Sequence, residues 1–194
     1  MVGNDIVDLA AAEKESNWRR SGFLEKVFTA KEQAYISNFH NQHLMVWLLW
    51  SMKESAYKIF VQENFTRLLA PLKFQCNINT DTEGNFSGEV LLNKNSYSTF
   101  SKISSEKIST TAYSKTFPVN FLSGDLIFSK TRQNEIIFSF FSEISENFNI
   151  PSGDLSIKKD DFNIPYLLHK GEHLKSSISF SHHGRFGAYA AEFF

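Results

Sequence analysis

The sequence predicts an α+β fold in which two halves of one globular unit each combine a small antiparallel sheet with a packed helix. Two stretches have the helical spacing of apolar residues, 44–61 and 135–148. Each is accompanied by short runs rich in β-formers that end at Gly, Asn or Ser turns, as hairpin strands do. A chain of 194 residues suits one such domain.

The composition excludes several classes of protein. Hydrophobic residues make up 42% of the chain, and Cys76 is the only cysteine, so the core needs neither disulfides nor zinc. The net charge of -1 gives no general attraction to nucleic acid or to an anionic membrane. No apolar run reaches the roughly 20 residues of a membrane-spanning helix, and Asp5 and Asp8 stand where a signal peptide would be basic. We therefore expect a cytoplasmic protein.

The N-terminal half starts with a strand over residues 1–9. Alternation along this strand points Asp5 and Asp8 to opposite faces, so only one of them can enter a given site. The next segment has helical spacing, and Thr29 with Glu32 forms a Thr-x-x-Glu capping box that should start a new helix.

The strongest helix signal spans residues 44–61, which contain no Gly or Pro. Residues 71–113 then favour an antiparallel meander. Residues 117–128 contain Pro118 and Gly124 and are expected to link a half at 1–116 to a half at 129–194.

The C-terminal half repeats this plan loosely. It contains the helix at 135–148, a basic strand at 155–159, an extended segment at 165–167, and a hairpin over 177–191 that turns at 183–185.

Three charged residues of the first half are the main candidates for chemistry. Glu54 and Lys58 stand at i and i+4, which is also the spacing of an ordinary surface ion pair. Glu54 lies on the Trp50 and Tyr57 stripe of its helix, however, and buried carboxylates are rare unless they are paired or bind a metal. Asp5 fits a turn residue equally well when it is taken alone. Together with Glu54 it would supply the one or two carboxylates that Mg²⁺ uses beside substrate phosphates.

The second half offers His182 as a donor towards phosphate, with Ser181 beside it, whereas His183 is expected to be the solvent-facing turn residue. Its lysines and Arg185 are individually ordinary solvated charges, although as a set they leave a phosphate pocket open. The chain has no Walker loop, no dinucleotide-binding glycine motif and no Gly-x-Ser-x-Gly elbow, which excludes those enzyme classes.

Four sequence elements together resemble the 4′-phosphopantetheinyl transferase superfamily. They are Gly3-Asn4-Asp5-Ile6-Val7-Asp8-Leu9, Phe28-Thr29-x-x-Glu32, Trp50-Ser51-x-Lys53-Glu54-Ser55-x-x-Lys58 and Ser179-x-Ser181-His182. The resemblance implies a holo-[acyl-carrier-protein] synthase or related 4′-phosphopantetheinyl transferase. Such an enzyme moves the phosphopantetheine arm of coenzyme A to a serine of an acidic acyl or peptidyl carrier protein, with Mg²⁺, and releases 3′,5′-ADP.

The resemblance also implies roles for individual residues. Asp5 and Glu54 match the metal ligands, and Asp8 or water stands as the third ligand because Val7 replaces a second acidic residue. Catalytic roles fall to Glu54, Lys53 and Lys58, with Glu54 or a metal-bound water as base and Lys53 as the acid for the leaving group. The residues implied in binding coenzyme A are Lys53, Lys58, His182, Ser181, Lys158 and Arg132, with Lys130 and Lys159 as further candidates for its 3′-phosphate.

The order of the motifs separates two versions of this family. In the long surfactin-type members the Ser-x-Ser-His half comes first, whereas here it comes last, so the chain resembles a circular permutation that should bring Phe194 near Met1. The alternative is a short holo-acyl-carrier-protein-synthase module enlarged by an insertion. Asn163-Ile164-Pro165 stands in place of the family's Gly-Lys-Pro, so the lysine of that motif is missing.

Partners follow from the same resemblance. An acidic carrier protein would dock near the helix after Asp8, where Lys14, Arg19, Arg20 and Lys26 are candidates, although each fits a solvated helix face equally well. Two fused halves favour a monomer. A non-catalytic module that binds coenzyme A or a carrier protein is the alternative function.

Overall fold

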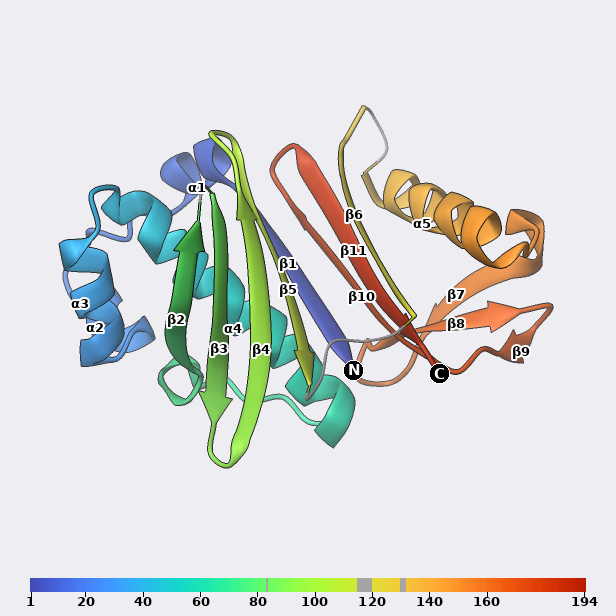
Figure 1. Cartoon of the computed structure of the whole chain (residues 1–194), viewed down its shortest axis with the longest axis horizontal. Helices are drawn as coiled ribbons and strands as arrows, with labels where there is room; N and C mark the ends of the chain where they lie inside the picture. The colour runs from blue at the N-terminus through green and yellow to red at the C-terminus, as the bar shows by residue number, and fades with distance from the viewer. Residues whose placement is uncertain (83, 115–119, 130–131) are drawn as a thin grey trace.

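The computed structural model describes residues 1–82, 84–114, 120–129 and 132–194. It shows a mixed α+β molecule in which two groups of antiparallel strands lie side by side, each with helices packed against it (Figure 1). The predicted fold class is confirmed. No described helix is long and apolar enough to span a membrane.

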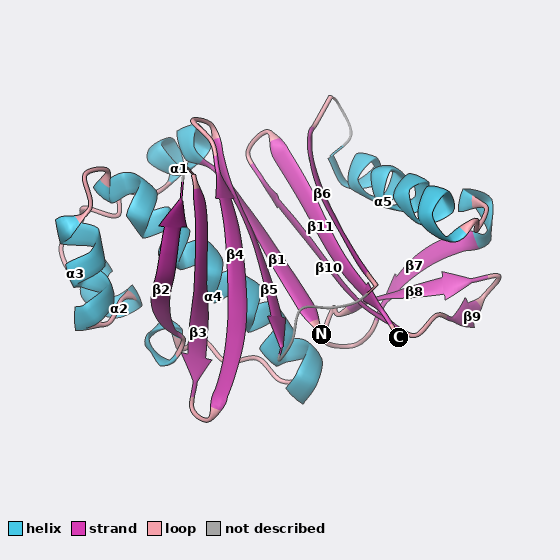
Figure 2. Ribbon diagram, viewed as in Figure 1, coloured by secondary structure: helices cyan, strands magenta, loops and turns pink. Residues whose placement is uncertain are grey.

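The first half is a five-stranded antiparallel sheet in the order β1-β5-β4-β3-β2. Its strands are β1 (Val2–Asp8), β2 (Gln75–Thr82), β3 (Asn85–Leu92), β4 (Asn95–Ile103) and β5 (Lys107–Ser114). Its helices are α1 (Leu9–Glu15), α2 (Phe23–Val27), α3 (Ala30–Asn38) and α4 (Gln42–Asn64), followed by the short η1 (Pro71–Lys73). The long helix α4 runs across one face of the sheet (Figure 2).

The second half contains two three-stranded sheets in the orders β10-β11-β6 and β7-β8-β9. Their strands are β6 (Phe121–Ile127), β7 (Leu155–Lys159), β8 (Pro165–His169), β9 (Glu172–His173), β10 (Ser176–His183) and β11 (Phe186–Phe193). The helix α5 (Arg132–Phe148) packs on the first of these sheets, and η2 (Ser152–Asp154) follows it (Figure 1).

Several local predictions are confirmed by this architecture. The capping box at Thr29 and Glu32 starts α3, with both reciprocal hydrogen bonds present. The meander after α4 is formed by β2 to β5, and the C-terminal hairpin by β10 and β11. Local capping and strand alternation were sufficient to predict these elements.

Most of the stretch expected as a linker is a strand instead. Residues 121–127 form β6, which pairs with β11 throughout, while residues 117–119 lie outside the part of the chain that the structure describes. Gly124 is explained by close packing, because a Cβ there would lie 2.5 Å from the hydroxyl of Tyr189. A glycine inside a strand can mark such a close approach rather than a break.

Helix α4 lies directly on β1 because Gly3 has no side chain. A Cβ at Gly3 would lie 2.1 Å from the carbonyl oxygen of Ser55 in α4. Gly3 therefore faces the helix, and alternation along β1 turns Asp5 and Val7 to the same side. The helix and the sheet enclose the main core, whose fully buried members include Leu48, Met52 and Ile59.

The two halves meet where β1 and β10 run parallel to each other, a contact that we call the seam. No ladder joins these strands; instead, serine hydroxyls of β10 accept hydrogen bonds from backbone amides of β1. Ser177 Oγ accepts from Val2 at 2.8 Å and Ser179 Oγ from Asn4 at 3.0 Å. The alternating serines therefore satisfy amides that would otherwise be unpaired at an internal sheet edge.

The ends of the chain lie next to each other (Figure 1). The N-terminal amine of Met1 is 2.8 Å from Oε2 of Glu192. This proximity is what the permuted motif order requires, because the seam lies between the first strand and the last hairpin.

Candidate functional site

Asp5 lies midway along β1, on the face that contacts α4. Its carboxylate is mostly buried and is 3.8 Å from Nζ of Lys58. Burial raises the pKa of Asp5, and the positive charge of Lys58 opposes that rise. The predicted strand parity is therefore observed, with Asp5 rather than Asp8 turned towards the helix.

Glu54 reaches the same region from α4. Burial is the main reason that its pKa is raised to about 7, and the nearby charge of Asp5 raises it further. Two carboxylates that influence each other in this way repel when both are ionised, and a cation between them would relieve the repulsion. The structure thus brings together the two acidic residues that the sequence paired.

Lys58 connects the acidic pair to both halves. Its Nζ donates to the carbonyl oxygens of Asn4 in β1 at 2.5 Å and of Phe180 in β10 at 3.3 Å. Burial lowers the pKa of this ammonium group, while Asp5 and Glu54 oppose the change. Lys58 therefore stands at the seam, beside the acidic pair and partly accessible to an anion.

The acidic pair has the donor chemistry of a magnesium site that is completed by substrate. Mg²⁺ prefers carboxylate oxygens, usually takes only one or two from the protein, and fills its octahedron with water and phosphate oxygens. Within the described ranges no group of three His, Cys, Asp or Glu residues is placed to hold a metal.

A cleft of about 470 Å³ lies next to Lys58, between the two halves. The first half contributes the C-terminal turns of α4, and the second half contributes β10 and the loop before β8. Cationic side chains in its lining are Lys58, Arg67 and Lys159, and apolar ones include Leu69, Phe162 and Ile178. Such a mixture suits a long ligand with both charged and apolar parts.

Lys53 is a correction to the sequence prediction. Its side chain is 3% exposed, and Nζ donates to Glu32 Oε2 at 2.9 Å and to the carbonyl oxygens of Phe74 at 2.7 Å and Pro71 at 3.0 Å. An ammonium group has three donors, so none remains for a phosphate. In this structure Lys53 therefore has no free donor for coenzyme A or its leaving group, and the roles expected for it are not supported.

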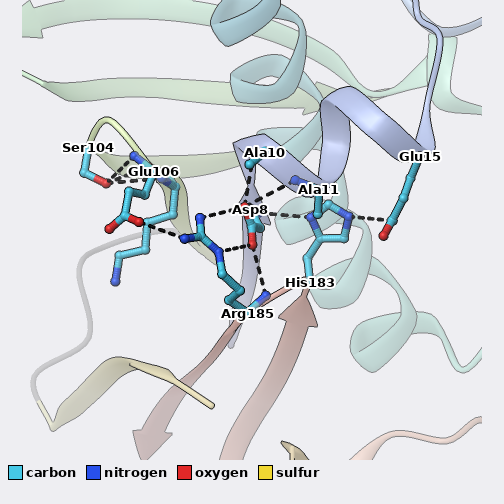
Figure 3. Close-up of polar contacts among 9 residues, drawn as sticks. Asp8, Ala10, Ala11, Glu15, Ser104, Glu106, His183 and Arg185 are labelled. Atoms are coloured by element: carbon cyan, nitrogen blue, oxygen red, sulfur yellow. Dashed lines mark hydrogen bonds and ion pairs between the residues drawn. The ribbon is translucent and has the colours of Figure 1, made fainter. Parts of the chain in front are cut away.

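Asp8 is also withdrawn from the metal ligands. Its carboxylate caps α1 by accepting from the amides of Ala10 and Ala11, and it accepts further hydrogen bonds from Arg185 (Figure 3). These bonds from Arg185 lower the pKa of Asp8 well below its usual range. Both oxygens of Asp8 therefore have partners within the protein.

The two histidines at the end of β10 differ in their surroundings, and His183 is not the solvent-facing turn residue that was expected. His182 is exposed, whereas His183 is partly buried and its Nδ1 accepts the backbone N–H of Asp8 at 3.0 Å. Ser181 is buried and its hydroxyl accepts from Nδ2 of Asn4, so it holds the seam and is not a free ligand. Strand parity contained this information, because position 183 shares a face with the serines at 177, 179 and 181.

The remaining candidates for the 3′-phosphate differ in whether they line the cleft. Lys158 is exposed and does not line the cleft, whereas its neighbour Lys159 does. The side chain of Arg132, and Lys130 as a whole, lie outside the described residues. Arg67, which the sequence analysis did not single out, lines the cleft and donates to the carbonyl oxygen of Phe162 at 3.5 Å.

Comparison with known protein families supplies the decisive observation. The family model of the 4′-phosphopantetheinyl transferase superfamily matches residues 1–118, which include Asp5, Glu54 and Lys58. The chain belongs to this superfamily. No protein of curated function matches the sequence.

One solved structure shows a weak overall likeness to this member of the phosphopantetheinyl transferase superfamily. The crystal structure of Thermotoga maritima holo-[acyl-carrier-protein] synthase is 7% identical and gives a TM-score of 0.42. The match covers 87% of this chain and 81% of the Thermotoga chain.

Proposed function

We propose that the protein transfers 4′-phosphopantetheine from coenzyme A to a serine of an apo acyl or peptidyl carrier protein, in a reaction that depends on Mg²⁺. Support comes from the convergence of Asp5, Glu54 and Lys58 at the seam, beside a cleft that both halves line. The superfamily match covers the segment that carries these three residues.

Each residue has a distinct role in this proposal. Asp5 and Glu54 would hold Mg²⁺, which when bound withdraws charge from the pyrophosphate oxygens of coenzyme A. Lys58 neutralises phosphate charge from the protein side, since its ammonium group is 3.8 Å from Asp5 and Lys58 also lines the cleft. The cleft receives the nucleotide part of coenzyme A, with Arg67 and Lys159 near its phosphates.

The chemical step joins the carrier serine oxygen to the β-phosphorus of coenzyme A and breaks the bond from that phosphorus to 3′,5′-ADP. Glu54 is assigned as the acceptor of the serine proton, because a carboxylate positioned beside the reacting oxygen can act as a general base. Most of the rate acceleration comes from positioning and charge stabilisation, as in other phosphoryl transfers.

Partners follow from the same arrangement. The acceptor is an acidic carrier protein in the cytoplasm, and Lys14 lines a hollow beside Asp8 and Arg185 where such a partner can approach. Because both walls of the cleft belong to one chain, a monomer is sufficient for activity.

Mass spectrometry tests the proposal directly. An apo carrier protein incubated with the enzyme, coenzyme A and Mg²⁺ should gain the mass of one phosphopantetheine group, and an equimolar amount of 3′,5′-ADP should form. Omission of Mg²⁺ and the variant Glu54→Gln should each abolish the gain.

The alternative function predicts a different result. If the wild-type protein binds coenzyme A by calorimetry but modifies none of a panel of acyl and peptidyl carriers, a non-catalytic binding module replaces the proposed transferase.

A further inference from the structure

A polar cluster at one end of the seam joins three turns that are far apart in the sequence (Figure 3). It contains Asp8 at the junction of β1 and α1, Glu106 between β4 and β5, and Arg185 between β10 and β11. Neither the metal site nor the cleft uses these side chains. The cluster therefore needs its own explanation.

Arg185 forms most of the connections in the cluster. Its Nε donates to Asp8 Oδ2 at 2.8 Å and its Nη2 to Asp8 Oδ1 at 3.0 Å, which is the bidentate pairing of a guanidinium with a carboxylate. Its backbone N–H donates to the same Oδ2 at 3.0 Å, and its Nη1 donates to Glu106 Oε1 at 2.8 Å. One side chain thus joins the last hairpin to two turns of the first half.

The turn of this hairpin packs closely against Asp8. His183 Nδ1 accepts the N–H of Asp8 at 3.0 Å, and Gly184 has a φ of 53°. A Cβ at Gly184 would lie 2.5 Å from Asp8 Oδ2, so only glycine allows so close an approach. The side chain of Asp8 is 2% exposed and that of Arg185 is 48% exposed, so the carboxylate of this bidentate pair is buried while the guanidinium reaches solvent.

The position of the cluster along the seam determines what it controls. Lys58 ties β1 to β10 at Asn4 and Phe180, next to the cleft. Arg185 ties the same two strands beyond Asp5, at Asp8 and the end of β10. Asp5 therefore lies between these two contacts along β1, and β10 ends at His183 just before the second.

We propose that Arg185 is a positioning residue, which acts through Asp8 to hold the end of β10 against β1 and so keeps this end of the seam aligned with the Asp5 and Glu54 pair. This inference rests on the proposed transferase function. Because Lys58 still holds the cleft end of the seam, loss of Arg185 should disturb the reacting groups more than the binding of coenzyme A.

The variants Arg185→Ala and Arg185→Lys test this role in the full-length protein. Arg185→Ala should lower kcat at least about tenfold, since misplacement on the order of 1 Å at reacting groups costs up to about a hundredfold. The dissociation constant for coenzyme A with Mg²⁺, measured by calorimetry, should stay within about threefold of the wild-type value, because Lys58 still holds the strands beside the cleft. Arg185→Lys should restore only part of kcat, because lysine keeps the charge but not the bidentate geometry.

Two controls separate positioning from general destabilisation. The calorimetric stoichiometry gives the concentration of folded protein, to which kcat is normalised. Tyr189→Phe removes the hydrogen bond from Tyr189 in β11 to Glu143 in α5, which takes no part in the Arg185 cluster, and should leave the normalised kcat within about twofold. In an Asp8→Asn background, Arg185→Ala should have little further effect, since both act through one pair.

The outcomes distinguish this inference from the proposed function. If wild-type protein transfers the arm and Arg185→Ala retains a normalised kcat within twofold of it, Arg185 serves stability alone and only the inference fails. The inference is also overturned if Arg185→Ala lowers the normalised kcat by the same factor in the wild-type and the Asp8→Asn backgrounds. If the wild type transfers nothing, the proposed function fails and the inference falls with it.

Discussion

The buried pair of Glu32 and Lys53 shows how a motif residue can have a structural role. Glu32 caps α3, accepts the N–H of Cys76 at 2.7 Å and pairs with Lys53, so it connects α3, α4 and β2. Both side chains are almost fully buried, and every charge is matched by hydrogen bonds. Removing one partner of such a pair leaves an uncompensated buried charge.

Lys53→Met should therefore lower the free energy of unfolding by about 3–5 kcal/mol, measured by urea denaturation. The turnover per folded molecule should stay within about threefold, because Lys53 has no donor left for substrate. The exposed neighbour Lys31 gives the control, since Lys31→Met should cost less than about 1 kcal/mol. A loss of turnover in Lys53→Met without loss of stability would contradict the structural role.

Asp8 predicts a particular response to acid. Because Arg185 lowers its pKa in the folded state below the ordinary value of 3.8, the unfolded chain takes up the proton first as the pH falls. The contribution of this carboxylate is complete above that ordinary value and is lost as the pH drops further. Asp8→Asn, which retains a capping side chain, removes the contribution.

The stability difference between wild type and Asp8→Asn should consequently be largest near neutral pH and should shrink between about pH 5 and pH 2. Urea unfolding at a series of pH values measures it. Parallel curves for the two proteins over that range would mean that Asp8 is not held as a carboxylate by Arg185.

At the scale of elements, the distance between α4 and β1 controls the site. Asp5 and Glu54 belong to different elements, and they approach only because Gly3 lets the helix lie on the strand. The same contact buries one face of α4 in the core. The packing of the helix and the approach of the two carboxylates therefore depend on the same small residue.

Gly3→Ala should push α4 away from β1, because the added Cβ meets the backbone of Ser55. We expect a loss of about 1–3 kcal/mol in the free energy of unfolding, as for other overpacked sites, with a fall in transfer activity. Gly153→Ala is the matched control, since a Cβ there has no neighbour within 4 Å. Wild-type activity and stability in Gly3→Ala would show that the helix does not need this close approach.

At the scale of the whole molecule, the seam makes the two halves one functional unit. Lys58, the alternating serines and Arg185 all connect β1 with β10 or the turn that follows it. Because the chain ends lie beside this seam, the covalent order of the halves is not what brings the site together.

A circular permutant tests that statement. Joining Phe194 to Met1 through a short Gly/Ser linker and opening the chain between Ser114 and Asn120 would give the motif order of the long family members. The permutant should keep the circular dichroism spectrum and should transfer phosphopantetheine within about tenfold of the original chain, as permutations with adjacent ends are tolerated. An unfolded permutant would show that the present order is required.

Local signals predicted much of the fold. Capping at Thr29, the uninterrupted stripe of α4 and the alternation of β1 each depend on residues close in sequence, so the elements themselves were predictable. Strand β6 was missed because Gly124 serves close packing with Tyr189, a contact between distant residues that no local pattern reveals. For the site, the motif identified Asp5, Glu54 and Lys58. Their approach to one another depends on contacts between distant residues.

What the sequence by itself determined was the set of chemical groups and the face of each element that carries them, because periodicity and capping are local properties. Only the tertiary structure decided which groups are free to act. Lys53 and Asp8 carry the same charges as Lys58 and Asp5, but protein partners already occupy them. Lys53 is held by Glu32 and two backbone carbonyls, and Asp8 by Arg185 and two amides of α1. Whether a charged side chain is left for substrate depends on partners brought in from elsewhere in the chain, and burial makes those pairings persistent.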